Sequence, residues 1–502
     1  MISVPNRLLL LNGSSCRSFL FIFCIGLVGL SACKTSSKTS TGGLSHVSVS
    51  RTTPSSTTVV NKSDIDPKPE MPKKVVEAPK VVKKESRVTF DTINTIYSKI
   101  LIKSTYQNNV LVSTEKVKVF PKIQKASKRI KGSYNVVVLL PFMTHLMGPS
   151  GIPSKSKMAI EYYTGMKVAF KSLQEEGINL NVKVYDEQAD TSVVMRLLES
   201  SELRNADLIL GPVSSDNLLQ VSNFSRVHGI PMISPLSSKD VSVCNPNFFQ
   251  INPSVTTHCE AVVRYALTQS SSPNVIIITR PFEEELEYGE RIEDNFIIQN
   301  KFGRTKIEKV VMGVDSIISF SSIEAKLSNS TDNFIFVSTL ANEDYLLSLF
   351  SSLKQHPDKK ITVFGLPKWS SLRDKGNIFS GINTIITDDI KESVNSDSES
   401  YKAFRLYFTK QNHYPPGEFN VKGFDHMLFV GRILNKYGTG LSEAFDNGYS
   451  TSLLLQRFAF RPTYQIYPTT GTKLATQAVV RGYENKDVRL KKFNGSSFSL
   501  IN

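Results

Sequence analysis

Apolar and polar positions between residues 206 and 238 follow a pattern that predicts one complete strand–helix–strand unit. Leu208 to Leu210 is a short apolar run ended by Gly211-Pro212, which is the length of a buried strand. Ser215 or Asp216 can cap the helix that follows. That helix has a mostly i, i+3, i+4 apolar face made of Leu218, Leu219, Val221, Phe224 and Val227.

A second strand is predicted at Ile230 to Ile233, again closed by Ser-Pro. Parallel strands joined through a helix have both carboxyl ends on one edge of the sheet. The serine clusters that follow the two strands should therefore share that edge. In open α/β sheets, ligands bind there.

Strand and helix signals alternate in the same way from Tyr134 onward. The predicted strands, besides the two above, are Asn135–Leu140, Leu180–Val184, Phe248–Ile251, Asn274–Ile278, Val310–Val311, Phe334–Val337, Ile361–Phe364 and Ile382–Ile386. The clearest helices are Met158–Phe170, Tyr345–Leu353, Phe404–Thr409 and Phe424–Leu434. Such alternation predicts parallel sheets with helices on both faces, and the length of the run indicates two sheets. From about Phe458 we expect short strands and turns.

The start of the chain indicates export. Arg7 and Arg17 precede an apolar run from Phe19 to Leu30, which is too short for a comfortable membrane span and suits a signal peptide covering residues 1–32. The run ends in Leu30-Ser31-Ala32-Cys33, which resembles a bacterial lipoprotein box, with Cys33 as the residue that takes the diacylglyceryl group. The alternative is an ordinary secretory signal with a chance cysteine.

A lipid anchor at Cys33 would hold the chain on the periplasmic side of a bacterial envelope. Lys34 stands where an aspartate would resemble an inner-membrane retention signal, so the outer membrane is favoured. Residues 33–85 are Ser/Thr-rich and then Pro/Lys-rich, cannot bury a core and predict a disordered linker.

Residues 86–132 predict a small basic segment with a strand, an amphipathic helix and a closing strand at Val117–Pro121. The order of its residues faintly resembles a degenerate LysM peptidoglycan-binding module, although the spacing is short and the expected glycines are missing. The alternative is a small structured tether or helix.

The net charge of +15 belongs to the tail. Residues 34–132 contain 20 Lys and Arg against 7 Asp and Glu, whereas residues 133–502 contain 38 of each sign. Nucleic acid is an unsuitable partner for an exported chain. The basic tail could meet anionic lipid or glycan surfaces, or it could be only a solvated linker.

No pattern for catalysis or metal binding emerges. The seven histidines are scattered, His-Glu-x-x-His and Cys-x-x-Cys are absent, and two Ser-x-x-Lys matches lack their companion motifs. We therefore predict a non-catalytic protein without cofactor or metal. Cys244 and Cys259 could form a disulfide in an oxidising periplasm, or they could be two separate buried thiols.

Residues 134–502 resemble type I periplasmic binding proteins of the branched-chain amino-acid receptor group. The matching stretches include Val136–Pro141, Tyr163–Ala169, Gly211–Ser215, Ile233–Pro235, Asn245–Ser254, Tyr288-Gly289 and Gly423–Asp425. The resemblance implies two Rossmann-like α/β lobes with parallel sheets, joined by three crossovers and closing on a ligand like a hinge. We assign lobe 1 to about 133–254 and 388–450, and lobe 2 to about 255–387 and 451–502.

The resemblance also implies ligand contacts. Ser215, beside Ser214, matches a hydroxyl that binds an amino-acid carboxylate, Ser238 matches its partner, and Tyr288 matches an aromatic of the opposite lobe. Hydroxyls and N–H groups at a helix N-terminus suit an anionic group. Alternatively, Ser215 is only a helix cap and Ser238 a turn residue. Trp369 could line the cleft or serve packing.

Two departures weaken an amino-acid site. The family holds the ligand's ammonium with an acid after a glycine, but Gly365 to Trp369 contains Lys368 and no carboxylate. The acidic run Glu283–Glu287 is typical of a solvated helix face. We therefore expect a lipid-anchored binding protein for a small polar ligand, amino-acid-like or cell-wall-derived, with a transporter as a potential partner.

The alternative is an envelope interaction protein that regulates a peptidoglycan synthase or tethers the cell wall. The lipid anchor and long linker are similar in plan to Bacteroidetes lipoproteins in which this fold follows LysM modules. They are also similar in plan to the penicillin-binding-protein activator lipoproteins of enterobacteria.

Overall fold

The computed structural model of the chain describes residues 86–94, 99–107, 110–119, 124–149, 151–239, 244–300, 305–313, 320–339, 342–390, 398–468 and 476–501. The predictions for the signal peptide, for lipidated Cys33 and for the linker lie outside the described residues.

The described part of the segment 86–132 begins with three strands. They are β1 (Ser86–Asn94), β2 (Lys99–Gln107) and β3 (Val110–Val119), and they form one sheet in the order β1-β2-β3. The predicted amphipathic helix is wrong, because its residues form strands: Val88, Phe90 and Ile93 fall in β1, and Ile100 to Ile102 in β2. The LysM-like interpretation stays a prediction.

Lobe 1 contains a seven-stranded sheet in the order β16-β17-β8-β7-β6-β4-β5. Its strands are β4 (Tyr134–Leu140), β5 (Leu180–Asp186), β6 (Leu208–Leu210), β7 (Met232–Ser234), β8 (Phe248–Gln250), β16 (Phe460–Pro468) and β17 (Thr476–Asn485). The pairs from β5 to β17 are parallel, and β16 is antiparallel to β17. The predicted parallel sheet is confirmed.

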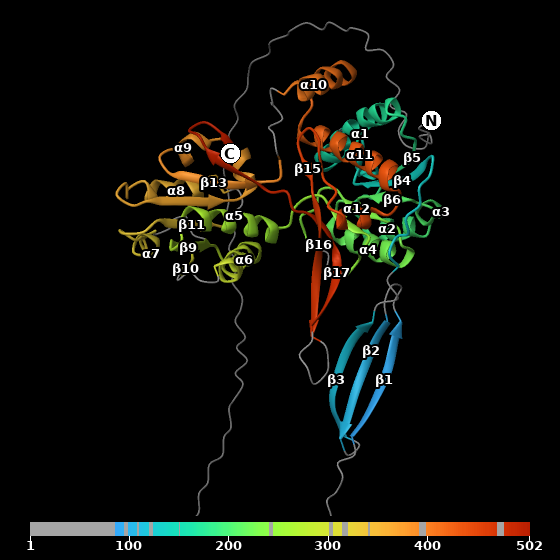
Figure 1. Cartoon of the computed structure of the whole chain (residues 1–502), viewed down its shortest axis with the longest axis horizontal. Coiled ribbons are helices and arrows are strands. Elements are labelled where there is room, and N and C mark those ends of the chain that lie inside the picture. Colours follow the sequence, from blue (N-terminus) through green and yellow to red (C-terminus); the bar gives the residue numbers. More distant parts are fainter. Residues whose placement is uncertain are drawn as a thin grey trace, which may run out of the picture. The chain divides into compact units, whose positions relative to one another are not determined.

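Helices cover both faces of this sheet, as Figure 1 shows. One face packs on α1 (Lys157–Glu175), α10 (Glu399–Asn412), α11 (Glu418–Tyr437) and α12 (Leu441–Asp446), and the other on α2 (Thr191–Leu198), α3 (Ser201–Arg204) and α4 (Ser215–His228). Helices α1 and α11 approach closely at glycines: a Cβ on Gly423 would lie 1.9 Å from the carbonyl oxygen of Tyr162.

Lobe 2 repeats the plan with the order β10-β9-β11-β12-β13-β18-β19. Its strands are β9 (Asn274–Thr279), β10 (Lys306–Val311), β11 (Asn333–Val337), β12 (Ile361–Gly365), β13 (Asn383–Asp388), β18 (Arg489–Phe493) and β19 (Phe498–Leu500). Its helices are α5 (Val255–Gln269), α6 (Glu283–Gln299), α7 (Ser321–Glu324), α8 (Glu343–Leu353) and α9 (Lys375–Phe379). The five strands from β10 to β13 are parallel, and β18 and β19 add antiparallel pairs.

The chain passes between the two sheets three times, between β8 and α5, between β13 and α10, and between β17 and β18. The third crossover corrects the lobe boundaries, because the described residues 451–468 and 476–485 belong with lobe 1 and not with lobe 2. Aromatic packing explains the correction: Tyr483 stacks on Phe249, and Phe460 packs on Phe445, all in the core of lobe 1.

Residues 124–133, which we call the strap, run over lobe 1 just before β4. The Gln124 N–H donates to the carbonyl of Arg226, the Arg129 N–H donates to the Thr439 hydroxyl, and the Thr439 N–H returns to the carbonyl of Arg129. Glycines make room for it, since a Cβ on Gly438 would lie 2.1 Å from the Arg129 oxygen.

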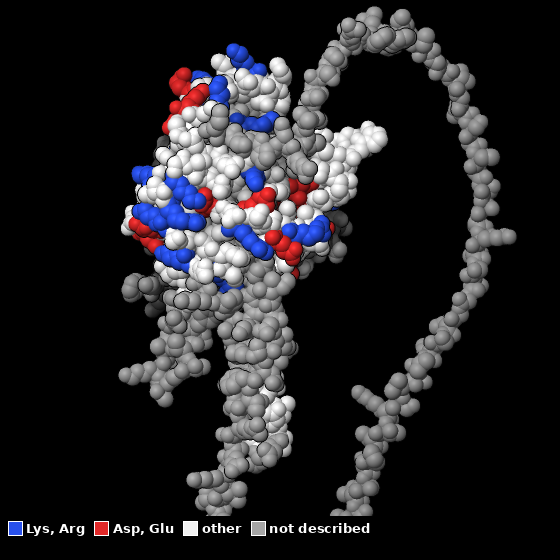
Figure 2. All heavy atoms as spheres, turned by 90° about the vertical axis from the view of Figure 1, so that its right-hand side faces the viewer, with Lys and Arg blue, Asp and Glu red and all other residues white. Residues whose placement is uncertain are grey.

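Basic side chains of the strap pair with acids of lobe 1. Lys131 and Arg129 lie 2.6 and 3.6 Å from the carboxylate of Asp207, which is 1% exposed. Lys128 contacts Glu443, at 3.3 Å. Figure 2 views the chain from the side of Figure 1 on which β4, β5 and α3 lie, and Lys and Arg cover more of that face than Asp and Glu. Part of the positive charge of the tail is therefore paired with acidic side chains of lobe 1.

Candidate functional site

The two serine clusters follow neighbouring strands of lobe 1, as predicted. Strand β6 pairs with β7, Ser214 and Ser215 follow β6, and Ser238 follows β7. Ser214 is the N-cap of α4 but makes no side-chain cap bond. Ser215 is half-buried at the first turn of α4, and Ser238 is exposed. The assignment of these hydroxyls to a ligand stays a prediction.

The turn that leads into α4 requires glycine. Gly211 has a φ of 101°, and a Cβ there would lie 2.2 Å from the carbonyl oxygen of Leu139 on the neighbouring strand β4. The backbone of Pro212 to Ser214 is thereby held against the carboxyl edge of the sheet. The Gly211–Pro212 peptide bond is cis.

The carboxylate of a glutamate accepts the N–H groups at the amino end of α4. Glu187, directly after β5, is fully buried, and its Oε1 accepts the N–H groups of Val213 at 3.0 Å and of Ser214 at 3.4 Å. Its Oε2 accepts a bond from the side-chain amide of Asn217, which is also fully buried. Burial raises the pKa of Glu187, and the bonds from Asn217, Val213 and Ser214 act in the opposite direction.

The loop after β5 is shaped to hold this carboxylate. Asp186, beside Glu187, accepts the N–H groups of Met143, Thr144 and Gln188 at 2.8–3.1 Å. Gln188 and Ala189 then take left-handed conformations with φ of 53° and 49°. Non-glycine residues are seldom found there and persist when their surroundings impose the conformation. Sequence reasoning missed Glu187, whose backbone partner Val213 lies 26 residues further along the chain.

Tyr288 and Trp369 are both buried, which corrects the ligand assignment of Tyr288 and favours the packing alternative for Trp369. Tyr288 is 3% exposed and Trp369 is fully buried in the core of lobe 2. The Trp369 indole N–H donates to the carbonyl of Thr339 at 2.8 Å, and its ring stacks on Phe379. Both aromatic side chains serve packing, because the apolar faces of α6 and of the turn after β12 lie against the sheet.

The carboxyl edge of the lobe 2 sheet corresponds to the edge of lobe 1 that the serines follow, and it carries arginines. An open cavity of about 640 Å³ is lined by Arg280, Asn342, Glu343 and Arg373. The guanidinium of Arg280 bonds both carboxylate oxygens of Glu285, which is 3% exposed and also accepts from Ser338 at 3.2 Å.

The acidic run on α6 is only partly the solvated face that the sequence predicted. Glu283, Glu284 and Glu287 are exposed, whereas Glu285 turns inward to Arg280. The predicted character is therefore wrong for Glu285 alone, since its carboxylate is needed to pair with a half-buried guanidinium.

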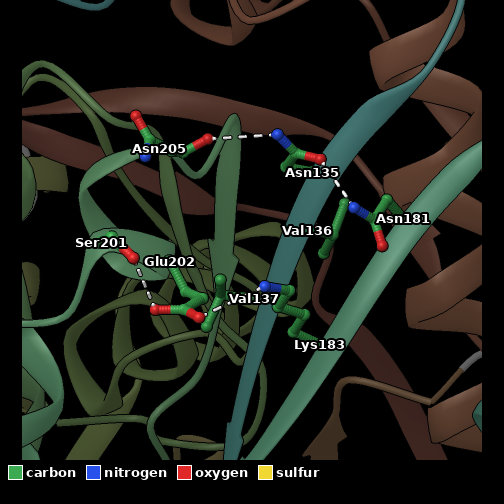
Figure 3. Close-up of a pocket in the computed structure, with 8 residues that line it drawn as sticks. All are labelled: Asn135, Val136, Val137, Asn181, Lys183, Ser201, Glu202 and Asn205. Carbon is green, nitrogen blue, oxygen red and sulfur yellow. Dashed lines mark hydrogen bonds and ion pairs between the residues drawn. The ribbon is translucent and has the colours of Figure 1, made fainter. Parts of the chain in front are cut away.

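A smaller cavity of about 130 Å³ lies against β4, β5 and α3 (Figure 3). Its polar groups are bonded to one another: the Asn181 amide donates to Asn135, and Ser201 and Lys183 both contact the carboxylate of Glu202. The cavity therefore presents few unsatisfied polar groups to a ligand.

Cys244 and Cys259 are both buried thiols, and no disulfide joins them. The predicted pairing is therefore wrong, and the alternative of two separate buried thiols holds. Within the described ranges, no group of three or more His, Cys, Asp and Glu could hold a metal ion. Nor does any helix in that part of the chain have the length and apolarity to cross a membrane.

Two parallel-dominant sheets, each covered by helices and joined by three crossovers, define the fold of a type I periplasmic binding protein. Residues 146–291 match the family model described as "Periplasmic binding protein". The resemblance predicted from the sequence is thereby confirmed. Among curated proteins, no match to the sequence was found.

Solved structures are similar to this chain at low identity. A protein from Rhodospirillum rubrum, described as a branched-chain amino acid ABC transporter, is 12% identical with a TM-score of 0.52, covering 74% of this chain and all of that one. A substrate-binding protein from Desulfitobacterium hafniense is 13% identical with a TM-score of 0.49, at the same coverage. Full-length LpoA from Haemophilus influenzae is 12% identical with a TM-score of 0.49, covering 76% of this chain and 60% of LpoA. The first of these supports the fold, and the fold alone.

Proposed function

We propose that this chain is a non-catalytic, lipid-anchored binding protein of a bacterial envelope whose partner is another envelope component, a peptidoglycan synthase or the cell wall. The anchor in this proposal is Cys33, on the periplasmic side and in the outer membrane. The basic linker would span the distance from the membrane to the partner.

One observation supports a macromolecular partner over a free amino acid. The N–H groups at the amino end of α4, which suit a ligand carboxylate, already bond the buried carboxylate of Glu187. On lobe 2, Tyr288 and Trp369 are buried and Arg280 is paired with Glu285. A zwitterionic amino acid would therefore find the N–H groups at α4 and the guanidinium of Arg280 already occupied.

A second candidate function is binding of a small polar ligand, with or without a transporter as partner. The open cavity on lobe 2 favours it, because Asn342, Glu343 and the exposed Arg373 could bond such a ligand. Ser214, Ser215 and Ser238 would contact the ligand from lobe 1 in this proposal.

Three measurements on the full chain separate the candidates. Purified sacculi, and crosslinking in intact cells, test the first: we expect the protein to sediment with sacculi or to crosslink to a synthase. A thermal-shift screen of amino acids, peptides and muropeptides tests the second. The first candidate fails if the chain neither sediments with sacculi nor crosslinks to a synthase while a free amino acid raises its Tm. A Cys33→Ser variant is the control for retention through the lipid anchor.

A further inference from the structure

Strands β16 and β17 continue beyond the sheet of lobe 1 as a two-stranded ribbon. They pair with each other at nine positions, whereas β17 pairs with β8 at only two, Tyr483 and Glu484. Residues 463–468 and 476–480, which we call the arm, therefore lie past the last pair that ties the ribbon to the sheet (Figure 1). A two-stranded ribbon alone is only marginally stable in water, so the arm would gain stability from a further strand.

The outer edge of β16 has the character of a pairing edge. Strand β16 is the last strand of its sheet, and among the described residues no further strand pairs with that edge. Edge strands usually carry charged residues that prevent pairing, but the arm contains no Asp, Glu, Lys or Arg. Tyr464 is 56% exposed, and Gln465 is also exposed. Pro462 and Pro468 flank the stretch, so the five residues from Thr463 to Tyr467 all keep their backbone N–H groups.

This stretch is suited to pairing with itself. When two identical strands pair antiparallel about a two-fold axis, the residue on the axis lies opposite its own copy, and a charged residue there would repel itself. The middle of the stretch is Gln465, which is uncharged. In this register Tyr464 lies opposite Ile466 of the other copy, an aromatic residue opposite a β-branched one. Residues 133–502 contain 38 charges of each sign, so no net charge of this part opposes the approach of two copies.

We propose that the arm is a self-association surface, on which β16 pairs antiparallel with β16 of a second copy of this chain about a two-fold axis at Gln465. The two seven-stranded sheets of lobe 1 would then form one continuous sheet. Five residues from each copy make a small interface, so the dimer is weak and reversible in solution. This inference goes beyond the proposed function, because it concerns two copies of the chain and holds whether the partner is the cell wall or a synthase.

Cysteine crosslinking of the full chain in intact cells tests the position of the axis. In Gln465→Cys the two thiols lie opposite each other, where paired antiparallel strands have Cα atoms about 4.5–5.5 Å apart, within reach of a disulfide. We expect most of this variant to run as a disulfide-linked dimer on a non-reducing gel. Cys244 and Cys259 are buried, and wild type gives the background from the remaining cysteines. The matched control is Gln411→Cys, at an exposed glutamine of α10, which should stay monomeric.

Charge substitutions on the axis test whether the pairing joins two copies of β16. Gln465→Lys and Gln465→Glu each place like charges opposite each other, and sedimentation equilibrium of the purified full chain should show about three- to fivefold weaker dimerisation for each alone. Mixing the two variants should restore dimerisation, because each lysine then lies opposite a glutamate. Gln411→Lys and Gln411→Glu should dimerise like wild type, alone and mixed.

A folded Gln465→Cys variant that forms no more dimer than Gln411→Cys would overturn the inference, as would a variant that crosslinks only to a different protein. Circular dichroism establishes that each variant is folded. Should Gln465→Cys fail to fold, Tyr464→Cys and Ile466→Cys chains with different tags are expressed together. The inference then requires a disulfide between the two kinds of chain and none in cells that express either kind alone.

Discussion

Asp425 on α11 shows how burial sets the charge of a single residue. Its carboxylate is fully buried and accepts the N–H groups of Leu454, Leu455 and Gln456 at 2.8–3.4 Å. Burial raises the pKa of Asp425 to about 7, and the three N–H groups only partly offset it. In the unfolded chain the same carboxyl has a pKa of about 3.9.

The folded chain therefore keeps a proton on Asp425 that the unfolded chain has lost between about pH 4 and pH 7. The contribution of Asp425 to the unfolding free energy is largest below about pH 4 and decreases as the pH rises to about 7. Above about pH 7 it no longer changes, and the total decrease is about 2–4 kcal/mol. We therefore compare the unfolding free energies of wild type and Asp425→Asn. The value for wild type should fall relative to that for Asp425→Asn by this amount as the pH rises from about 4 to about 7. Urea unfolding at pH 4.5, 5.5, 6.5 and 7.5 measures it.

The control for this prediction is Asp216→Asn, which removes an exposed carboxylate of α4. Its unfolding free energy should stay within about 0.5 kcal/mol of wild type at neutral pH. A difference between wild type and Asp425→Asn that does not change with pH would mean that Asp425 ionises alike in both states.

The residue scale also shows where the sequence stops being informative. Ser214, Ser215 and Gly211 could be located from local pattern, because a turn and a helix start depend on neighbours in sequence. The role of Glu187 depends on Val213, which is 26 residues away. Trp369 was ambiguous for the same reason, since its indole partner Thr339 is 30 residues away.

At the scale of elements, buried strands were predictable and their partners were not. Val136 to Leu140 and Val275 to Ile278 are apolar at every position, which only a doubly covered strand requires. Strands β16 and β17 contain both polar and apolar residues, and their local sequence does not indicate which sheet they join. Aromatic packing of Tyr483 on Phe249 decides it in favour of lobe 1.

The strap allows a sharp prediction at this scale. Gly438 and Gly448 both have positive φ, 63° and 80°, but only Gly438 faces an obstacle, the Arg129 oxygen. Gly448→Ala should cost about 1 kcal/mol through backbone strain alone. Gly438→Ala should cost about 2–4 kcal/mol, because the added methyl group also displaces the strap.

Urea unfolding gives both costs, and limited trypsin digestion reports the strap directly. Lys125, Lys128, Arg129 and Lys131 are the cleavage sites, and we expect faster cleavage there in Gly438→Ala than in Gly448→Ala. Equal costs and equal cleavage in the two variants would show that the strap does not depend on the space at Gly438.

At the scale of the whole molecule, side chains tie the three crossovers to one another. Glu484, at the end of β17, where the third crossover begins, accepts the N–H of Ser254 in the first crossover and the hydroxyl of Thr257 at the start of α5, both at 2.6 Å. Lys491 on β18, just beyond the third crossover, lies 2.7 Å from Asp388, the last residue of β13 before the second crossover. A receptor that closes on its ligand changes its backbone at such positions. Buried bonds between all three crossovers therefore favour a protein with a stiff hinge.

Removing Glu484 tests this stiffness. In Glu484→Ala the buried Ser254 N–H loses its acceptor and the Lys486 ammonium keeps only the Thr257 hydroxyl. We expect the unfolding free energy to fall by about 3–5 kcal/mol. The control is Glu443→Ala, which removes a half-exposed partner of Lys128 and should cost less than about 1 kcal/mol. Hydrogen exchange should quicken in Glu484→Ala at residues 254–258 and 384–390 together, while β4 and β9 keep their protection. Exchange that quickens at residues 254–258 alone would mean that the crossovers open independently and that the hinge is not held as one unit.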